Sequence, residues 1–364
     1  MNRSVPIEPT RRVYHRPLGL ALLTAVVSAA LVSCAPTGDA PEIALLLPDK
    51  KTARYETFDR PLFEQRVAEH GEYGVLYANA DQDAAKQQQQ AESALASGVK
   101  VLVLDPVDAK AAVTIVNAAR AQDVPVISYD RLVDGGGLAY YVSFDNVRVG
   151  ELQAEALSQA LEAQGDVDGG VLMVNGSPTD SNAALFREGA LRVLADRGVP
   201  VLAEYATPDW SPDKAQDWVA GQISQYGDRI AAVYAANDGT ASGAIAALRA
   251  ADVTPLPIVT GQDAELTAIQ RILMGDQYMT VYKALRPQAR RAADVAVDLL
   301  EGRPVVGDTQ VEGTPATLLA PVAVTVDDIM STIVADGFWT VADICTREYA
   351  AACEAAGIRE DETP

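Results

Sequence analysis

The chain is poor in histidine and cysteine: its 364 residues contain two of the former and three of the latter. A Ser-His-Asp or Cys-His catalytic centre would have to use His70, because His15 lies in an N-terminal segment that we expect to be removed. The sequence around His70 predicts the exposed C-terminal end of a helix, where a cation opposite the helix dipole is sufficient explanation. Both residue types are too few for a zinc cluster, so we expect no metal.

Nucleotide-binding and hydrolase fingerprints are missing as well. The chain has no G-x-x-x-x-G-K-[ST] phosphate loop, no G-x-G-x-x-G and no G-x-S-x-G turn. We therefore expect no cofactor and no enzyme activity. A glycosidase stays open at this point, since that reaction needs only two carboxylates and Asp130 and Asp263 are available.

Basic residues are scarce: 29 Lys and Arg face 50 Asp and Glu, which gives a formal net charge of −21. A nucleic-acid partner requires a concentrated basic surface, so this balance argues against one. Net acidity of this size favours solubility. The length and an apolar fraction of 49% predict two globular domains rather than one.

The N-terminus has the pattern of a signal peptide. Four arginines precede an apolar run over residues 18–32, which is followed by Ser33 and Cys34. The run is shorter than the roughly 20 residues that span a bilayer, and small residues follow it directly. We therefore expect residues 1–33 to be a signal peptide, and a retained membrane span is the weaker interpretation.

The tetrapeptide that ends at Cys34 resembles a bacterial lipobox. This resemblance implies a diacylglycerol anchor on Cys34, with residues 34–41 as a short lipidated tether, and hence an extracytoplasmic protein held at the cell membrane. An ordinary signal peptide that happens to end near a cysteine stays open. Residues 10–14 also look like a twin-arginine export signal, which the sequence does not separate from an ordinary one.

Outside the cytoplasm, Cys345 and Cys353 are candidates for a disulfide. A straight helix would hold them about 12 Å apart, beyond the Cα separation of roughly 7 Å that a disulfide allows. The bridge therefore requires a turn between the two cysteines.

A strand, helix, strand pattern occurs twice in the chain. One copy runs from an apolar strand at Asp105 to a second strand at Asp130, and the other runs at the same spacing from Asp238 to Asp263. Such units form right-handed parallel crossovers, so these acids lie at the carboxyl ends of strands, where open α/β sheets bind ligands. We interpret Asp105 as a cap of the next helix. The polar neighbours of Asp130 and Asp263 favour a binding site.

Several local motifs together resemble bacterial D-xylose-binding proteins over roughly residues 43–337. They are Ser128-Tyr129-Asp130-Arg131, Tyr141-Val142-Ser143-Phe144-Asp145-Asn146, Asn175-Gly176-Ser177-Pro178-Thr179-Asp180, Ala236-Asn237-Asp238-Gly239-Thr240, Gly261-Gln262-Asp263-Ala264 and Met279-Thr280-Val281-Tyr282-Lys283. The resemblance implies the type I periplasmic binding protein fold, an α/β fold of two doubly wound parallel-sheet lobes joined by a three-crossing hinge.

The crossings are expected near Asp145, Tyr282 and Thr314. The N-terminal lobe would then hold residues 42–144 and 282–313, and the C-terminal lobe residues 145–281 and 314–364.

The family's sugar contacts fall on ten positions of this chain. They are Arg54, Tyr55, Asp130, Arg131, Asn182, Arg187, Trp210, Asn237, Asp263 and Lys283. In this set, carboxylates accept from sugar hydroxyls, guanidinium groups donate to them, and aromatic rings cover the faces of the sugar. Tyr55 stands where the family has tryptophan, which puts the fine sugar selectivity in doubt.

The implied function is capture of a monosaccharide, foremost xylose, by lobe closure and its delivery to an ABC permease, with the protein acting as a monomer. Glucose, arabinose and ribose stay open as ligands, and so does a role as a sugar sensor for a membrane receptor. A repressor of the lactose type shares the two-lobed fold but needs a basic helix-turn-helix at the N-terminus, where this chain has an apolar run.

Overall fold

A computed structural model describes residues 42–165 and 169–359 of the protein. The described residues belong to one compact unit. The predicted signal peptide, Cys34 and the tether lie outside the described residues. Within the described part of the chain, no helix is long and apolar enough to cross a membrane.

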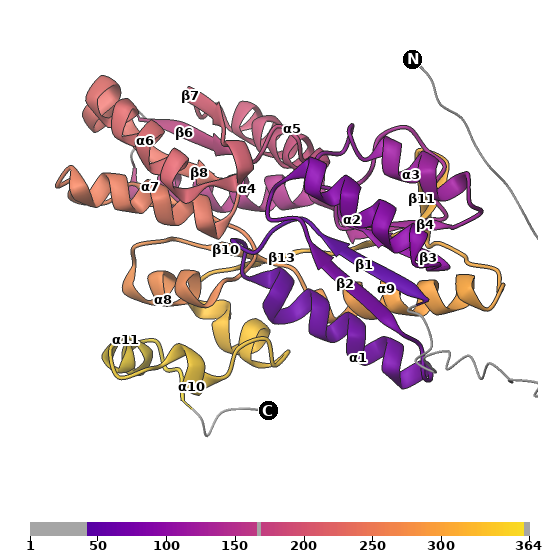
Figure 1. Ribbon diagram of the computed structural model, residues 1–364. Helices are drawn as coiled ribbons and strands as arrows, with labels where there is room; N and C mark the ends of the chain where they lie inside the picture. Colours follow the sequence, from indigo (N-terminus) through magenta and orange to yellow (C-terminus); the bar gives the residue numbers. More distant parts are fainter. Residues whose placement is uncertain (1–41, 166–168, 360–364) are drawn as a thin grey trace, which may run out of the picture. The chain divides into compact units, whose positions relative to one another are not determined.

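The first lobe is built on a seven-stranded sheet in the order β11-β12-β5-β4-β3-β1-β2 (Figure 1). The pairs are parallel except β11 with β12, which is an antiparallel hairpin at the edge. β1, β3, β4 and β5 are buried along their whole length, as expected of parallel strands covered on both faces. The strands are β1 (Ile43–Leu47), β2 (Val75–Asn79), β3 (Val101–Leu104), β4 (Val126–Tyr129), β5 (Tyr140–Phe144), β11 (Thr309–Val311) and β12 (Thr314–Leu319).

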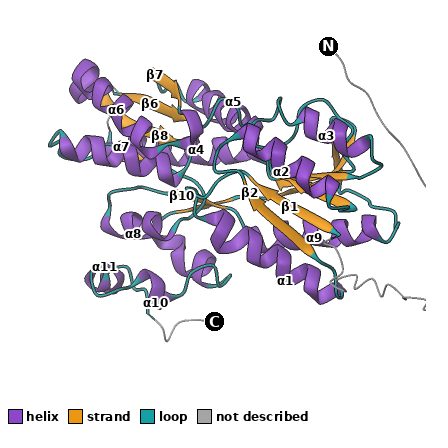
Figure 2. Cartoon of the chain, viewed as in Figure 1, coloured by secondary structure: helices purple, strands orange, loops and turns teal. Residues whose placement is uncertain are grey.

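Helices cover both faces of this sheet (Figure 2). On one face, α1 (Arg60–His70) and α9 (Leu285–Leu300) share an apolar cluster with the sheet. On the other face, α2 (Ala84–Ala96) and α3 (Val113–Arg120) form a second cluster. A π-helical turn, η1 (Tyr55–Asp59), precedes α1 and carries binding-site residues.

The second lobe is built on a four-stranded parallel sheet in the order β7-β6-β8-β9. Its strands are β6 (Gly170–Asn175), β7 (Val201–Ala206), β8 (Ile230–Ala235) and β9 (Ile258–Val259). One apolar cluster joins the sheet to α4 and α5, and another joins it to α6 and α7. The helices are α4 (Asn146–Gln164), α5 (Ser181–Asp196), α6 (Pro212–Tyr226), α7 (Asp238–Ala250) and α8 (Leu266–Met274), with short turns η2 (Pro208–Trp210) and η3 (Gly227–Arg229).

The chain passes between the lobes at three places. β5 leads into α4 at Asp145, and β10 (Thr280–Tyr282) leads into α9. β10 pairs antiparallel with β13 (Val322–Val324). The expected third crossing near Thr314 is placed too early, because β12 pairs with β5 in the first sheet through Leu319. Sequence pattern alone does not show that β12, the second strand of the β11-β12 hairpin, belongs to the first sheet.

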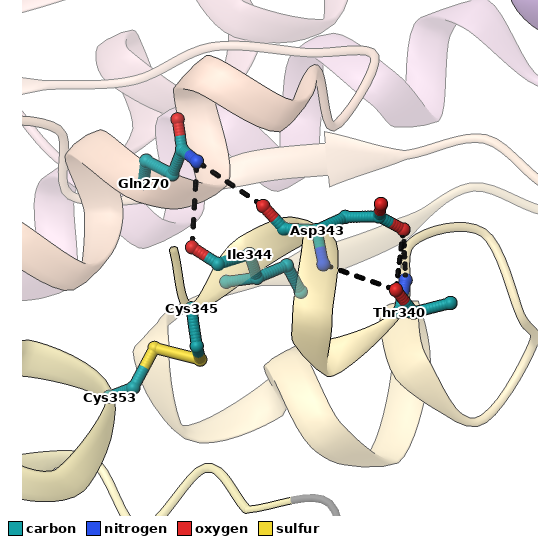
Figure 3. The surroundings of a disulfide bond; sticks show 6 residues. All are labelled: Gln270, Thr340, Asp343, Ile344, Cys345 and Cys353. Carbon is teal, nitrogen blue, oxygen red and sulfur yellow. Dashed lines mark hydrogen bonds between the residues drawn. A yellow bond between two sulfur atoms is a disulfide. The ribbon is translucent and has the colours of Figure 1, made fainter. Parts of the chain in front are cut away.

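After β13 comes a C-terminal segment, residues 326–358, of short helices. These are η4 (Val326–Asp328), η5 (Ile329–Val334), α10 (Val341–Ile344) and α11 (Ala350–Ala355). Both α10 and α11 contact α8 of the second lobe. A disulfide joins Cys345 to Cys353 with a Cα separation of 5.9 Å, and the residues between α10 and α11 supply the required turn (Figure 3).

Candidate functional site

The carboxyl ends of strands from both sheets meet at one pocket. It is narrow and partly open to solvent, and side chains from both lobes line it. Nine of the ten expected site residues line it, and Arg187 does not. The lining residues are Thr52, Arg54, Tyr55, Asp130, Arg131, Asp180, Asn182, Phe186, Trp210, Asn237, Gln262, Asp263 and Lys283.

Arg54 is held in place by three buried partners. Its Nε and Nη2 donate to the two carboxylate oxygens of Asp59 at 2.8 Å each, and Nη2 also donates to Gln288 Oε1 at 2.9 Å. Nη1 forms an ion pair with Asp130. These contacts leave the guanidinium group little freedom to rotate, so Arg54 faces the pocket in a fixed geometry.

Asp130 follows β4 with a φ of 59°, a left-handed conformation that costs energy in a residue other than glycine and is often found at functional sites. Burial alone would raise the pKa of its carboxyl, but Arg54, Lys283 and Arg131 outweigh burial and lower the pKa to about 2. Asp130 is therefore ionised at neutral pH and acts as an acceptor of hydrogen bonds.

Arg131 is surrounded by carboxylates. Its Nε forms an ion pair with Asp180 Oδ2 in the second lobe at 2.8 Å, and its Nη2 donates to the Tyr55 hydroxyl at 3.2 Å. Asp105 Oδ1 lies 3.6 Å from Nε. Arg131 thus links the two lobes beside the pocket.

The interpretation of Asp105 as a helix cap is wrong. The following helix, α3, has no side-chain cap, and neither oxygen of Asp105 has a hydrogen-bond partner in the described part of the chain. Burial raises the pKa of this carboxyl well above its usual range. The residue lies behind Arg131 and does not line the pocket.

Asn182, near the start of α5, reaches across to the first lobe. Its Nδ2 donates to Asp130 Oδ1 at 2.7 Å, and its Oδ1 accepts from Asn146 Nδ2 at 2.9 Å. This second hydrogen bond fixes which way the Asn182 amide points.

Trp210 forms one wall of the pocket. Its Nε1 donates to Asp180 Oδ2 at 3.0 Å, and its ring meets Phe186 edge to face at a centroid distance of 6.4 Å. Gly176 permits this position, because a Cβ there would lie 2.1 Å from the indole ring. The wall is thus an aromatic surface whose polar edge is already satisfied.

The pocket also carries Asp263 and Lys283. Lys283 Nζ lies 2.9 Å from Asp263 Oδ1 without the alignment of a hydrogen bond, and Asp263 Oδ1 has no other partner within residues 42–165 and 169–359. Gln262 Oε1 is also buried in the pocket, and it has no hydrogen-bond partner among the described residues. Asn237 lines the pocket while its Oδ1 caps α7 by accepting from Thr240 N–H. A ligand with several hydroxyl donors would satisfy these acceptors.

Arg187 lies elsewhere. Its side chain is 44% exposed and forms two hydrogen bonds of 2.7 Å with Glu204 on the surface of the second lobe. Arg187 misses the pocket because of its position on α5: the preceding residue, Phe186, lines the pocket instead.

Four lining residues are absent from the expected set: Thr52, Asp180, Phe186 and Gln262. Asp180 and Gln262 belong to motifs that the sequence already singles out, so their place at strand ends was a usable signal. Phe186 and Thr52 carry no such signal, because an apolar helix residue and a loop threonine have many ordinary roles.

Comparison with known proteins identifies the family of this chain. A family model for the periplasmic binding protein domain matches residues 43–304. The D-xylose-binding periplasmic protein of Escherichia coli is 34% identical over 325 residues, which are 87% of this chain and 96% of that protein. A multiple sugar-binding periplasmic receptor of Rhizobium radiobacter is 31% identical over 346 residues, 88% of this chain and 97% of that protein.

Solved structures match the fold. An ABC transporter solute-binding protein from Clostridium phytofermentans with bound β-D-glucose has a TM-score of 0.75 and 28% identity, covering 83% of this chain and 99% of that one. A carbohydrate transporter solute-binding protein from Chloroflexus aurantiacus in complex with D-glucose has a TM-score of 0.75, with 83% and 98% covered. The resemblance to D-xylose-binding proteins and the type I fold are confirmed, and the enzyme alternative is excluded. The chain belongs to the periplasmic binding protein family.

Proposed function

We propose that the protein captures a monosaccharide, xylose in the first place, between its two lobes and delivers it to an ABC permease. The observation that carries the proposal is the pairing of ionised or unsatisfied acceptors with fixed guanidinium donors in one buried pocket. Asp130 and Arg54 come from the first lobe, and Asp263 comes from the second. A pyranose offers hydroxyls that both donate and accept, which is what this pocket requires.

The relatives favour a sugar but differ in which one. The 34% identical proteins of Escherichia coli and Haemophilus influenzae are named for D-xylose, whereas the two 28% identical structures hold glucose. We propose that a single sugar ring occupies the pocket between the lobes. Tyr55 and the aromatic wall at Trp210 are the side chains that we propose to cover its faces.

Lobe closure is the proposed mechanism of capture. Contacts such as those of Arg131 with Asp180 and of Asn182 with Asp130 join the lobes beside the pocket. A ligand that touches both lobes favours the closed arrangement, because some of its contacts exist only there. The permease would then recognise the closed form. The binding protein itself would be a monomer, anchored outside the cytoplasm through lipidated Cys34. A sensor that reports occupancy to a membrane receptor is the alternative use of the same closure.

Calorimetric titration of residues 39–364 with xylose, glucose, arabinose, ribose and galactose tests the proposal. We expect one sugar to bind tightly and saturably, with xylose the strongest. Absence of binding at millimolar concentrations of all five sugars would remove the sugar assignment. For the anchor, mass spectrometry of the mature protein should find a diacylglycerol group on Cys34, and an unmodified Cys34 would contradict lipidation at that residue.

A further inference from the structure

An aromatic contact away from the pocket joins the first lobe to the C-terminal segment. Phe58 lies on η1, the turn that also carries Tyr55 and is packed against α1 and α9 of the first lobe. Its ring stacks on Phe338 of the C-terminal segment, with centroids 4.1 Å apart and planes inclined by 14°. The two residues are far apart in sequence, and neither lines the pocket.

Trp339 extends this contact to the loop of the second lobe that carries Asp263. Its ring meets Phe58 edge to face at a centroid distance of 5.0 Å. Its Nε1 donates to the carbonyl oxygen of Ala264 at 2.9 Å. Because Ala264 follows Asp263 directly, the indole connects a first-lobe aromatic ring to the backbone beside a carboxylate of the pocket.

The C-terminal segment itself is fastened to the second lobe and to the crossing strands. Gln270 on α8 donates to the carbonyl oxygens of Ile344 and Asp343 at 3.4 and 3.5 Å, and the Cys345–Cys353 disulfide closes the end of the segment (Figure 3). The ring of Tyr282 on β10 packs edge to face on Phe338 at a centroid distance of 5.0 Å. The segment is therefore fastened on one side. On the other side Phe58 stacks on it, and Leu62 and Leu285 of the first lobe belong to the same apolar cluster.

The stack joins a residue of the first lobe to a segment fastened to the second, so a motion that separates the lobes acts directly on this contact. A contact made only in the closed arrangement raises ligand affinity without touching the ligand, because it increases the population of the state that binds. We infer that the C-terminal segment acts as a clasp, and that Phe58, Phe338 and Trp339 are positioning residues that set ligand affinity through closure. The inference rests on the proposed lobe closure.

Phe58→Ala in residues 39–364 tests the clasp. Loss of the stacked ring is expected to weaken xylose binding about tenfold, with most of the change in the dissociation rate. Tyr205→Ala is the matched control, because Tyr205 stacks on Trp218 at 5.4 Å wholly within the second lobe. The control is expected to unfold at a lower temperature and to keep the wild-type affinity.

Two conservative variants separate a clasp from a general loss of structure. Phe58→Tyr keeps the ring and should restore the affinity, whereas Trp339→Phe keeps a ring but loses the donor to Ala264 and should bind several-fold more weakly than wild type. Wild-type affinity in both Phe58→Ala and Trp339→Phe overturns the inference. So does an equal loss of affinity in Tyr205→Ala.

Small-angle scattering of the sugar-free proteins gives a readout that needs no ligand. Phe58→Ala should have a larger radius of gyration than wild type, and Tyr205→Ala should not. If wild type binds none of the five sugars, the proposed function fails while this comparison still decides the clasp. An unchanged radius of gyration in sugar-free Phe58→Ala then overturns it.

Discussion

Asn182 Nδ2 of the second lobe lies 2.7 Å from Asp130 Oδ1 of the first, so one hydrogen bond joins the lobes at the pocket itself. The bond ends on an ionised carboxylate, and such hydrogen bonds are stronger than neutral ones. Truncation by Asn182→Ala is expected to weaken sugar binding by about tenfold or more, because both the cross-lobe bond and the proposed sugar contact are lost. Calorimetric titration measures the change. An unaltered dissociation constant would take Asn182 out of the binding account.

Asp130 also makes stability depend on acid. Burial opposes its ionisation, but Arg54 and the other nearby cations bring its pKa down to about 2 from 3.8. Since the folded pKa is the lower one, the stabilisation is complete above about pH 4 and is lost as the pH falls toward 2. Asp130→Asn should lower the free energy of unfolding by about 2 kcal/mol at pH 7 and by less at pH 3. Urea unfolding at the two pH values checks this, and an equal loss at both would contradict it.

Glu265 should produce the opposite dependence at higher pH. Burial, followed by Asp238 and Asp263, raises its pKa from 4.5 to about 8, although the Ala53 N–H opposes the shift. The folded state therefore favours the protonated carboxyl, and its contribution to stability declines as pH rises from about 4.5 to 8. Glu265→Gln should make the thermal midpoint fall less between pH 5 and pH 8 than it does in wild type. Parallel declines in the two proteins would show that Glu265 is not the source.

Gly176 is expected to be essential for the aromatic wall. A Cβ at this position would meet the Trp210 ring at 2.1 Å, so Gly176→Ala must displace the indole from the pocket. Affinity for sugar should fall about tenfold or more. Gly221→Ala is the control, since a Cβ there meets no atom within 4 Å and alanine favours the α6 helix. Similar affinities for both variants would separate Trp210 from sugar binding.

Replacement of Arg187 is expected to leave the sugar affinity unchanged. The resemblance to xylose-binding proteins puts it in the site, but the structure pairs it with Glu204 at the surface. Exposed ion pairs contribute at most about 1 kcal/mol, so Arg187→Ala should keep the sugar affinity and change stability little. A tenfold loss of affinity would restore Arg187 to the site and would require α5 to present that side chain differently in the bound state.

Much of the fold is readable from strand ends. The apolar runs that end before Asp130 and Asp263 become β4 and β9, and the run over residues 43–47 is β1. Parallel strands buried on both faces leave a strong signal, because most of their residues are apolar. The placement of β12 leaves none, since its membership of the first sheet depends on pairing with β5, a contact that no local pattern encodes.

The binding site is partly readable for the same reason. Asp130, Asp263 and their neighbours occur at strand ends in recognisable motifs, so their convergence follows from topology. Helix residues are harder, because the choice between Phe186 and Arg187 depends on how α5 is rotated about its axis. The clasp formed by Phe58 and Phe338 is beyond sequence reasoning, since two aromatic residues in separate lobes carry no mark of their contact.

The most direct test of the central claim is a crystal structure of the protein with the sugar that binds best in titration. The account predicts a single sugar ring between the lobes, with hydroxyls within hydrogen-bond distance of both the Asp130 and the Asp263 carboxylates and with Trp210 against one face. A sugar bound to one lobe only, or outside the pocket lined by these residues, would contradict it.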